Sequence, residues 1–208
     1  MRVVTAEQST PEWFAARCGV PSGSRFADIM AQGKGGAPSA TRAKYLAELA
    51  VEAVTGVKTE FTTTAAMQHG IDTEPLARAA YEARTGEFVD EIGFCLHDTL
   101  NCGVSPDGLV GSAGMTEYKC PQPHTHAEYM RRADAPPQYK WQQQGQLWVC
   151  EREWNDFVSY QPSFPENCRL IVRRVYRDES AIKSLETEVI RFIEELQQEI
   201  DFYRSYSE

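Results

Sequence analysis

The chain has 208 residues, of which 42% are hydrophobic and 25% charged, and a formal net charge of −9. A chain of this length and composition can bury a core without disulfides and is not intrinsically disordered. No apolar run reaches the roughly 18 residues that a membrane span needs, and the first residues lack the basic leader and apolar core of a secretory signal. We therefore expect one folded domain, residues 1–208, in a reducing cytoplasm.

Neither the cysteines nor the histidines clearly indicate a metal site or a redox site. The six cysteines are scattered and include no C-x-x-C pair, so they are expected to be ordinary thiols. His124 and His126 form an H-x-H pattern, but no third ligand is evident, and a solvated pair in a loop is favoured over zinc.

The acidic balance argues against a uniformly basic DNA-binding protein, because Lys and Arg supply most non-specific affinity for phosphates. The acidic excess is concentrated in residues 61–100 and 151–208, whereas residues 1–60 and 101–150 are close to neutral. Residues 1–60 and 101–150 can therefore contact a polyanion without strong charge repulsion.

The first part of the chain is predicted to be helical. Hydroxyl residues at helix starts and glycines just after helix ends set the boundaries. The predicted helices are a short one that begins at Pro11 and ends before Gly19, a second that begins after Ser24, a third from Ser39 to about Thr55, and a fourth from about Thr64 to Thr85.

The pattern then changes to strands. Segments 88–96, 100–110 and 115–120 alternate like strands joined by polar turns and predict an antiparallel meander. A helix over 138–150, strands over 154–161 and 168–176, and a long amphipathic helix over 179–204 complete the chain. The predicted class is α/β (α+β), with helices around a central mixed sheet that includes the antiparallel meander.

The strongest chemical signal lies on the predicted hairpin. Asp107 and Glu117 sit on its two arms and can converge on one cation, and Glu117 and Lys119 share a face because strand side chains alternate. Two carboxylates, assisted by the Tyr118 carbonyl, suit Mg²⁺ or Mn²⁺, while a lysine beside the metal can orient the attacking water. This is the chemistry of phosphodiester hydrolysis. The alternative is that these are exposed hairpin charges, with Lys119 as a cross-strand partner.

Four ordered blocks resemble the phage lambda exonuclease family, the YqaJ-type viral recombinases with a PD-(D/E)xK nuclease core. The blocks are residues 12–24, residues 69–77, residues 102–109 together with 117–121, and residues 139–148.

The resemblance implies a restriction-endonuclease-like fold and assigns the site residues. Asp107, Glu117 and the Tyr118 carbonyl would bind the metal, Lys119 would handle the water, and Glu74 would be a further active-site acid. A pocket for a terminal 5′-phosphate would be formed by Arg17, Ser24, Ser105, Gln144 and, in a weaker supporting role, Gln142. Ser22 could stand in for Ser24.

The resemblance also implies a function. It predicts a Mg²⁺-dependent 5′-to-3′ exonuclease that acts on linear double-stranded DNA, releases mononucleotides and leaves 3′ overhangs. It further predicts a ring-shaped homotrimer, a single-strand annealing protein as partner, and a phage or prophage origin with action in the bacterial cytoplasm. The alternatives are an endonuclease with the same metal core and a non-catalytic protein that binds DNA ends.

Overall fold

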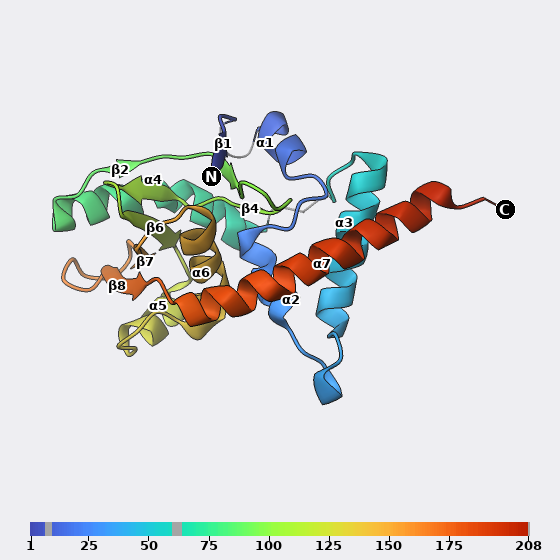
Figure 1. Ribbon diagram of the computed structural model, residues 1–208. Coiled ribbons are helices and arrows are strands. Elements are labelled where there is room, and N and C mark those ends of the chain that lie inside the picture. The colour runs from blue at the N-terminus through green and yellow to red at the C-terminus, as the bar shows by residue number, and fades with distance from the viewer. Residues whose placement is uncertain (7–9, 60–63, 208) are drawn as a thin grey trace.

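The computed structural model describes residues 1–6, 10–59 and 64–207 and contains both helices and strands (Figure 1). Up to the end of the predicted hairpin, its elements are β1 (Arg2–Val4), α1 (Pro11–Ala16), α2 (Phe26–Met30), α3 (Ala40–Thr55), α4 (Ala65–Thr85), β2 (Val89–Asp90), β3 (Phe94–Leu96), β4 (Gly103–Val104), β5 (Gly108–Val110) and β6 (Gly114–Lys119). The remaining elements are α5 (Pro123–Met130), α6 (Lys140–Val149), β7 (Trp154–Tyr160), β8 (Leu170–Tyr176) and α7 (Glu179–Ser205).

Capping residues that the sequence predicts are found at the ends of helices α1, α3 and α4. The Thr10 hydroxyl accepts a hydrogen bond from the Trp13 amide at the start of α1, and Ser39 and Thr64 cap α3 and α4 in the same way. Ser9, the other hydroxyl residue before α1, lies outside the described residues. Gly56 and Gly86, each with a positive φ, end α3 and α4.

The strands form two sheets. A five-stranded sheet has the order β2-β5-β6-β7-β8, in which β6 and β7 are parallel and the other neighbours antiparallel. A three-stranded antiparallel sheet has the order β1-β3-β4. The predicted mixed sheet with flanking helices is thus confirmed.

The predicted meander is wrong in one respect. Segments 88–96 and 100–110 were each expected to be one strand, but each divides into two short strands that belong to different sheets. Pro106 has no amide hydrogen to donate to a ladder, which helps to end β4 before β5 begins. The two breaks place Glu91 and Asp107 between the sheets.

Helix α5 is not predicted from the sequence, and the expectation that His124 and His126 form a solvated pair in a loop is wrong. Pro123 occupies its first turn, where a missing amide hydrogen costs nothing. His126 is buried in this helix, where Nδ1 lies 2.8 Å from the Ser159 hydroxyl and Nε2 lies 2.9 Å from the Cys168 carbonyl oxygen. Both ring nitrogens of His126 therefore have partners within the protein. His124, by contrast, is exposed.

The five-stranded sheet is covered on both faces. Tyr118 and Val158 pack with Tyr81 of α4 on one face, whereas Met115 and Phe157 contribute to hydrophobic clusters with α6 and α5 on the other. The long helix α7 runs across α2, α3 and α6, and its C-terminal end projects past α3 (Figure 1). Among the described residues, no helix is long and apolar enough to cross a membrane.

Candidate active site

The β5–β6 hairpin brings the predicted carboxylates together. Asp107 immediately precedes β5, where Gly108 lies opposite Thr116, so Asp107 lies next to Glu117 on the neighbouring strand. The Tyr118 amide donates a hydrogen bond of 2.6 Å to Oδ2 of Asp107 and fixes that carboxylate. The Tyr118 side chain points to the α4 side of the sheet, away from Glu117 and Lys119.

Glu117 is the best anchored of the acidic side chains. It is 2% exposed, and its Oε1 accepts hydrogen bonds from Lys119 Nζ at 2.6 Å and Gln142 Nε2 at 2.5 Å. Its Oε2 accepts a hydrogen bond of 2.5 Å from Gln146 Nε2, and Oε1 of Gln146 in turn accepts one from Asn155 of β7. One strand and one helix therefore hold this carboxylate in a single orientation.

The helical repeat explains which glutamines reach the site. Gln142 and Gln146 are four residues apart and face the sheet together, whereas Gln144 points to the other side of α6. The Gln144 amide donates to the Tyr176 carbonyl at 2.9 Å, and its oxygen accepts from the Asp178 amide at 2.9 Å. The structure therefore does not bring Gln144 to the expected phosphate pocket, and it places Gln142 at Glu117 instead.

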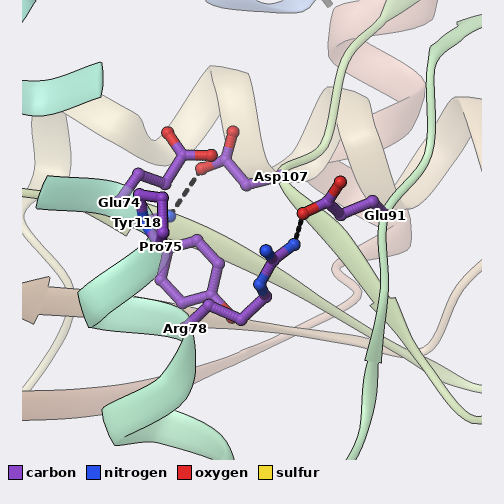
Figure 2. A pocket seen from close by; sticks show the side chains of 6 residues that line it. All are labelled: Glu74, Pro75, Arg78, Glu91, Asp107 and Tyr118. Carbon is purple, nitrogen blue, oxygen red and sulfur yellow. Dashed lines mark hydrogen bonds and ion pairs between the residues drawn. The ribbon is translucent and has the colours of Figure 1, made fainter. Parts of the chain in front are cut away.

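Glu74 reaches the same site from α4. Figure 2 shows its carboxylate beside that of Asp107, at the wall of a small cavity. Burial raises the pKa of Glu74, and the nearby Glu117 carboxylate raises it further. The structure thus joins Glu74 to the hairpin acids, although 33 residues separate it from Asp107 in the sequence.

The electrostatics indicate a site with excess negative charge. Burial raises the pKa of Asp107 well above its usual range, and the Glu117 and Glu74 carboxylates add to that effect. Burial alone would lower the pKa of Lys119, but Glu117 and Asp107 outweigh it, so the pKa of Lys119 is raised and its amine stays charged. Crowded carboxylates of this kind favour a bound cation.

A larger cavity of about 340 Å³ opens next to these acids. It is lined by Thr5, Ala6, Glu74, Glu91, Ile92, Gly93 and Asp107, so it lies between α4 and the three-stranded sheet. This volume falls in the range of roughly 300–1,000 Å³ that is typical of small-ligand pockets.

The donor set fits a hard divalent cation. Asp107, Glu117 and Glu74 offer carboxylate oxygens, which Mg²⁺ and Mn²⁺ prefer to the nitrogen or sulfur ligands of zinc. No group of three or more His, Cys, Asp or Glu side chains has ready-made metal-binding geometry within the described part of the chain. An ion here would therefore rely on Asp107 and Glu117, with waters and substrate oxygens completing its shell.

Arg17 lies apart from the acids, in surroundings that suit an anion. Its guanidinium lies over the Trp13 ring at 4.0 Å, and burial lowers its pKa. The Ser22 hydroxyl is 3.4 Å from Nη2, and no carboxylate pairs with Arg17 among the described residues. Ser22 thus lies where Ser24 was expected, and Ser24 is exposed.

Ser105 supplies a further hydroxyl close to the Arg17 segment, because Ser22 forms an isolated bridge with Gly103 at the start of β4. It follows β4, and its hydroxyl is buried without a hydrogen-bond partner in the described structure. Buried hydroxyls normally have partners. The hydroxyl of Ser105 is therefore available to a ligand.

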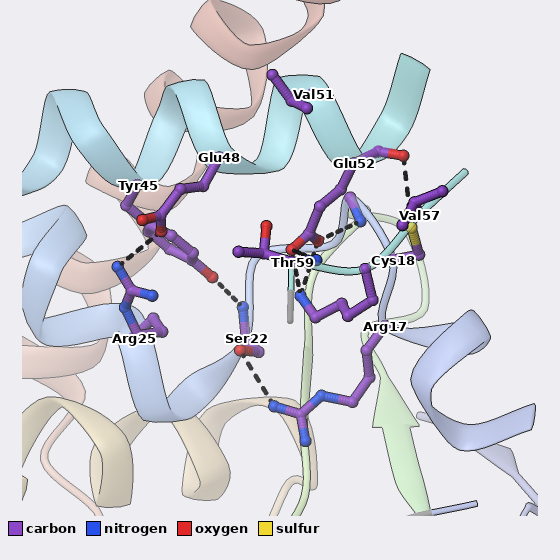
Figure 3. A network of polar contacts seen from close by, with 12 residues as sticks. Arg17, Cys18, Ser22, Arg25, Tyr45, Glu48, Val51, Glu52, Val57 and Thr59 are labelled. Atoms are coloured by element: carbon purple, nitrogen blue, oxygen red, sulfur yellow. Dashed lines mark hydrogen bonds and ion pairs between the residues drawn. The ribbon is translucent and has the colours of Figure 1, made fainter. Parts of the chain in front are cut away.

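Helix α3 holds the segment that carries Arg17 and Ser22 (Figure 3). The Ser22 amide donates to the Tyr45 hydroxyl at 3.0 Å, and the Gly19 amide donates to Oε2 of Glu52 at 3.0 Å. Gly19 has φ +70°, and a Cβ there would lie 2.9 Å from the Cβ of Ala53. The left-handed backbone and the close approach both require glycine.

Several residues of the site were missed in the sequence. Gln146, Tyr45 and Glu52 act through partners far away in the chain, so no local pattern identifies them. Arg78 lines the small cavity with Glu74 and Asp107, and its position four residues after Glu74 is a signal that helical spacing provides.

A family model and several solved structures match this chain. The model of the YqaJ-like viral recombinase domain matches residues 12–153, which is more than half of the chain. The chain belongs to the YqaJ-like viral recombinase family. No curated protein matches the chain.

Solved structures extend the likeness to nearly the whole chain. An alkaline exonuclease, LHK-Exo from Laribacter hongkongensis, is 42% identical with a TM-score of 0.87, and the match covers 94% of this chain and 96% of that one. The same values hold for LHK-Exo in complex with dAMP. A phage-related exonuclease from Haemophilus somnus 129PT, 16% identical with a TM-score of 0.72 over 88% of this chain and 95% of that one, shares the fold.

Proposed function

We propose that the protein is a Mg²⁺-dependent exonuclease that degrades linear double-stranded DNA from its 5′ ends. It releases mononucleotides and leaves 3′ overhangs for recombination. Mn²⁺ is the expected substitute for Mg²⁺. The observation that carries the proposal is the convergence of Asp107, Glu117 and Lys119 on one hairpin, supported by the 42% identity to an alkaline exonuclease.

The residues of the site have distinct tasks in phosphodiester hydrolysis. Asp107 and Glu117, with the Tyr118 carbonyl, would hold a divalent ion, which when bound supplies Lewis-acid stabilisation and lowers the pKa of a bound water. Lys119, kept charged and fixed by Glu117, orients the attacking water and offers positive charge to the phosphate oxygens. Gln142 and Gln146 keep Glu117 in place.

Arg17, Ser22 and Ser105 form the proposed site for the terminal 5′-phosphate. A guanidinium and two hydroxyls match the bidentate and single hydrogen bonds that a phosphate accepts. The Arg17 guanidinium lacks a carboxylate partner among the described residues, and the Ser105 hydroxyl lacks a hydrogen-bond partner there. An anion would satisfy both groups.

The proposed setting is recombination. Because the chain belongs to a viral recombinase family, we propose that a single-strand annealing protein receives the overhang in the cytoplasm of a bacterium that carries a phage or prophage. A homotrimeric ring around the DNA would reconcile the net charge of −9 with DNA binding if the acidic segments face outward. Sedimentation tests the ring, and a monomer at micromolar concentration would contradict it.

The direct test uses linear 5′-phosphorylated duplex DNA and the same DNA as a closed circle, each with Mg²⁺. The wild type should consume only the linear DNA, and Lys119→Ala should consume neither. Lys44→Ala, which removes an exposed lysine on α3, serves as the matched control and should behave like the wild type.

Each alternative function predicts a different result. An endonuclease with the same core would cut the circle. A protein that only binds DNA ends would leave both substrates intact while still retaining the linear DNA in a binding assay.

A further inference from the structure

Arg78 shares a wall of the active-site cavity with the acids. It lies one helical turn after Glu74 on α4, and both side chains face the cavity that Asp107 and Tyr118 also line (Figure 2). No sequence motif assigns a role to Arg78, and phosphodiester hydrolysis at Asp107, Glu117 and Lys119 does not require it.

Arg78 is the one positive charge among the described residues that line the two adjoining cavities. Glu74, Glu91 and Asp107 line both of them, and all the other lining residues are uncharged. The walls of the two cavities therefore present three carboxylates and a single guanidinium to a phosphate, while Lys119 lies beyond them at Glu117.

The ion pair that Arg78 forms with Glu91 is a weak one. Arg78 forms an ion pair with Glu91, which lies in the connection between β2 and β3 and has a side chain that is 67% exposed. The Arg78 side chain is only 29% exposed. An ion pair with one partner so exposed contributes little to stability, because water solvates the Glu91 carboxylate and salt screens the pair.

A phosphate is a better partner than this carboxylate. The planar guanidinium binds two phosphate oxygens at once, and the interaction is stronger when water is excluded from a cavity. Glu91 can turn outward into water at little cost, whereas the position of Arg78 on α4 keeps its guanidinium at the cavity.

We propose that Arg78 binds a backbone phosphate of the DNA strand in the active-site cavity and that Glu91 holds the guanidinium in place until the phosphate displaces it. The inference rests on the proposed nuclease function, because it takes the strand to pass beside Asp107 and Glu74. Arg78 then compensates for the carboxylates that would otherwise repel the strand.

The test is a double-mutant cycle that measures binding of a 5′-phosphorylated duplex without added metal, together with KM and kcat with Mg²⁺. Arg78→Gln should weaken binding and raise KM about tenfold, and it should reduce the slope of log affinity against log salt by about one. Glu91→Gln removes the competing carboxylate and should tighten binding about twofold to fivefold. Arg78→Lys should recover only part of the affinity, because an amine cannot bind two oxygens in a plane.

The double variant separates competition from a purely structural ion pair. If Glu91 acts mainly by occupying Arg78, adding Glu91→Gln to Arg78→Gln should tighten binding clearly less than Glu91→Gln tightens binding of the wild type. Arg191→Gln and Glu179→Gln remove charges from ion pairs of α7 outside the cavities and should leave affinity unchanged. Thermal unfolding should show that all variants stay folded.

Two results would overturn the inference: Glu91→Gln weakening binding as Arg78→Gln does, or Arg78→Gln leaving affinity, KM and the salt slope unchanged. Either can occur while the wild type still degrades linear DNA, so the proposed function would stand. Failure of the wild type to degrade linear DNA would instead contradict the proposed function.

Discussion

Nε2 of Gln146 donates a hydrogen bond of 2.5 Å to Oε2 of Glu117, and this contact joins helix α6 to strand β6 of the β5–β6 hairpin. The hydrogen bond from Asn155 Nδ2 to Oε1 of Gln146 fixes the orientation of the Gln146 amide. The amide of Gln146 therefore presents its donor, and not its oxygen, to the carboxylate.

Gln146→Met should remove this support while preserving the volume of the side chain. We expect activity at fixed Mg²⁺ to fall about 10-fold to 100-fold and the Mg²⁺ concentration for half-maximal activity to rise, as is usual when a partner of a metal ligand is lost. A Mg²⁺ titration of the wild type and the variant checks this. An unchanged Mg²⁺ requirement would show that Glu117 does not depend on Gln146.

Gln144→Leu should lower the stability of the protein and leave its preference for DNA ends unchanged. The Gln144 side chain links α6 to the backbone of Tyr176 and Asp178, and it lies on the side of α6 away from Glu117. We expect the variant to lose about 1–3 kcal/mol of unfolding free energy, because two partly buried hydrogen bonds to the backbone are lost. Its preference for 5′-phosphorylated over 5′-hydroxyl ends should stay the same. A lost preference in a protein of normal stability would restore Gln144 to the phosphate pocket.

Tyr45→Phe tests how α3 supports the Arg17 segment. The substitution leaves the Ser22 amide without its hydroxyl partner but keeps the aromatic ring under Arg25. We expect KM for 5′-phosphorylated ends to rise by several fold, with less effect on 5′-hydroxyl ends. An equal change in KM for both kinds of end would mean that the hydroxyl contributes only stability.

The raised pKa of Asp107 predicts how stability depends on pH. A carboxyl with a raised pKa binds its proton more tightly in the folded than in the unfolded state, so it destabilises the protein as the pH rises from the ordinary carboxyl range through the folded pKa. Asp107→Asn removes this cost and can still accept the hydrogen bond from the Tyr118 amide. Without added metal at neutral pH, its Tm should therefore lie above that of the wild type, by about 2–4 °C for each kcal/mol.

The same variant should have no nuclease activity, since it lacks the carboxylate charge. Gain of stability with loss of activity would identify Asp107 as a functional residue held at an energetic cost. A lower Tm at neutral pH in the absence of metal would contradict the electrostatic account of the site.

The sequence predicted the local features of this molecule better than its long-range contacts. The hairpin with Asp107, Glu117 and Lys119 depends on turn residues and alternation within 13 residues, and the structure has the same arrangement. The phosphate pocket depends on contacts between elements that are far apart in the chain. Gln144 was expected there, but its side chain points to Tyr176, and Gln142, two residues earlier on α6, contacts Glu117 instead. Strand patterns alone could not show that the chain changes sheets at Glu91 and at Asp107, because both halves of each segment are extended.

End-labelled DNA tests the central claim most directly. A linear duplex that carries a label at its 5′ ends should release the label early, as a mononucleotide, with the wild type and Mg²⁺, and Asp107→Asn should release none. The same duplex labelled at its 3′ ends should keep its label on long single strands. Early release of the 3′ label, or release of the 5′ label on longer fragments instead of mononucleotides, would contradict an exonuclease that works from the 5′ end.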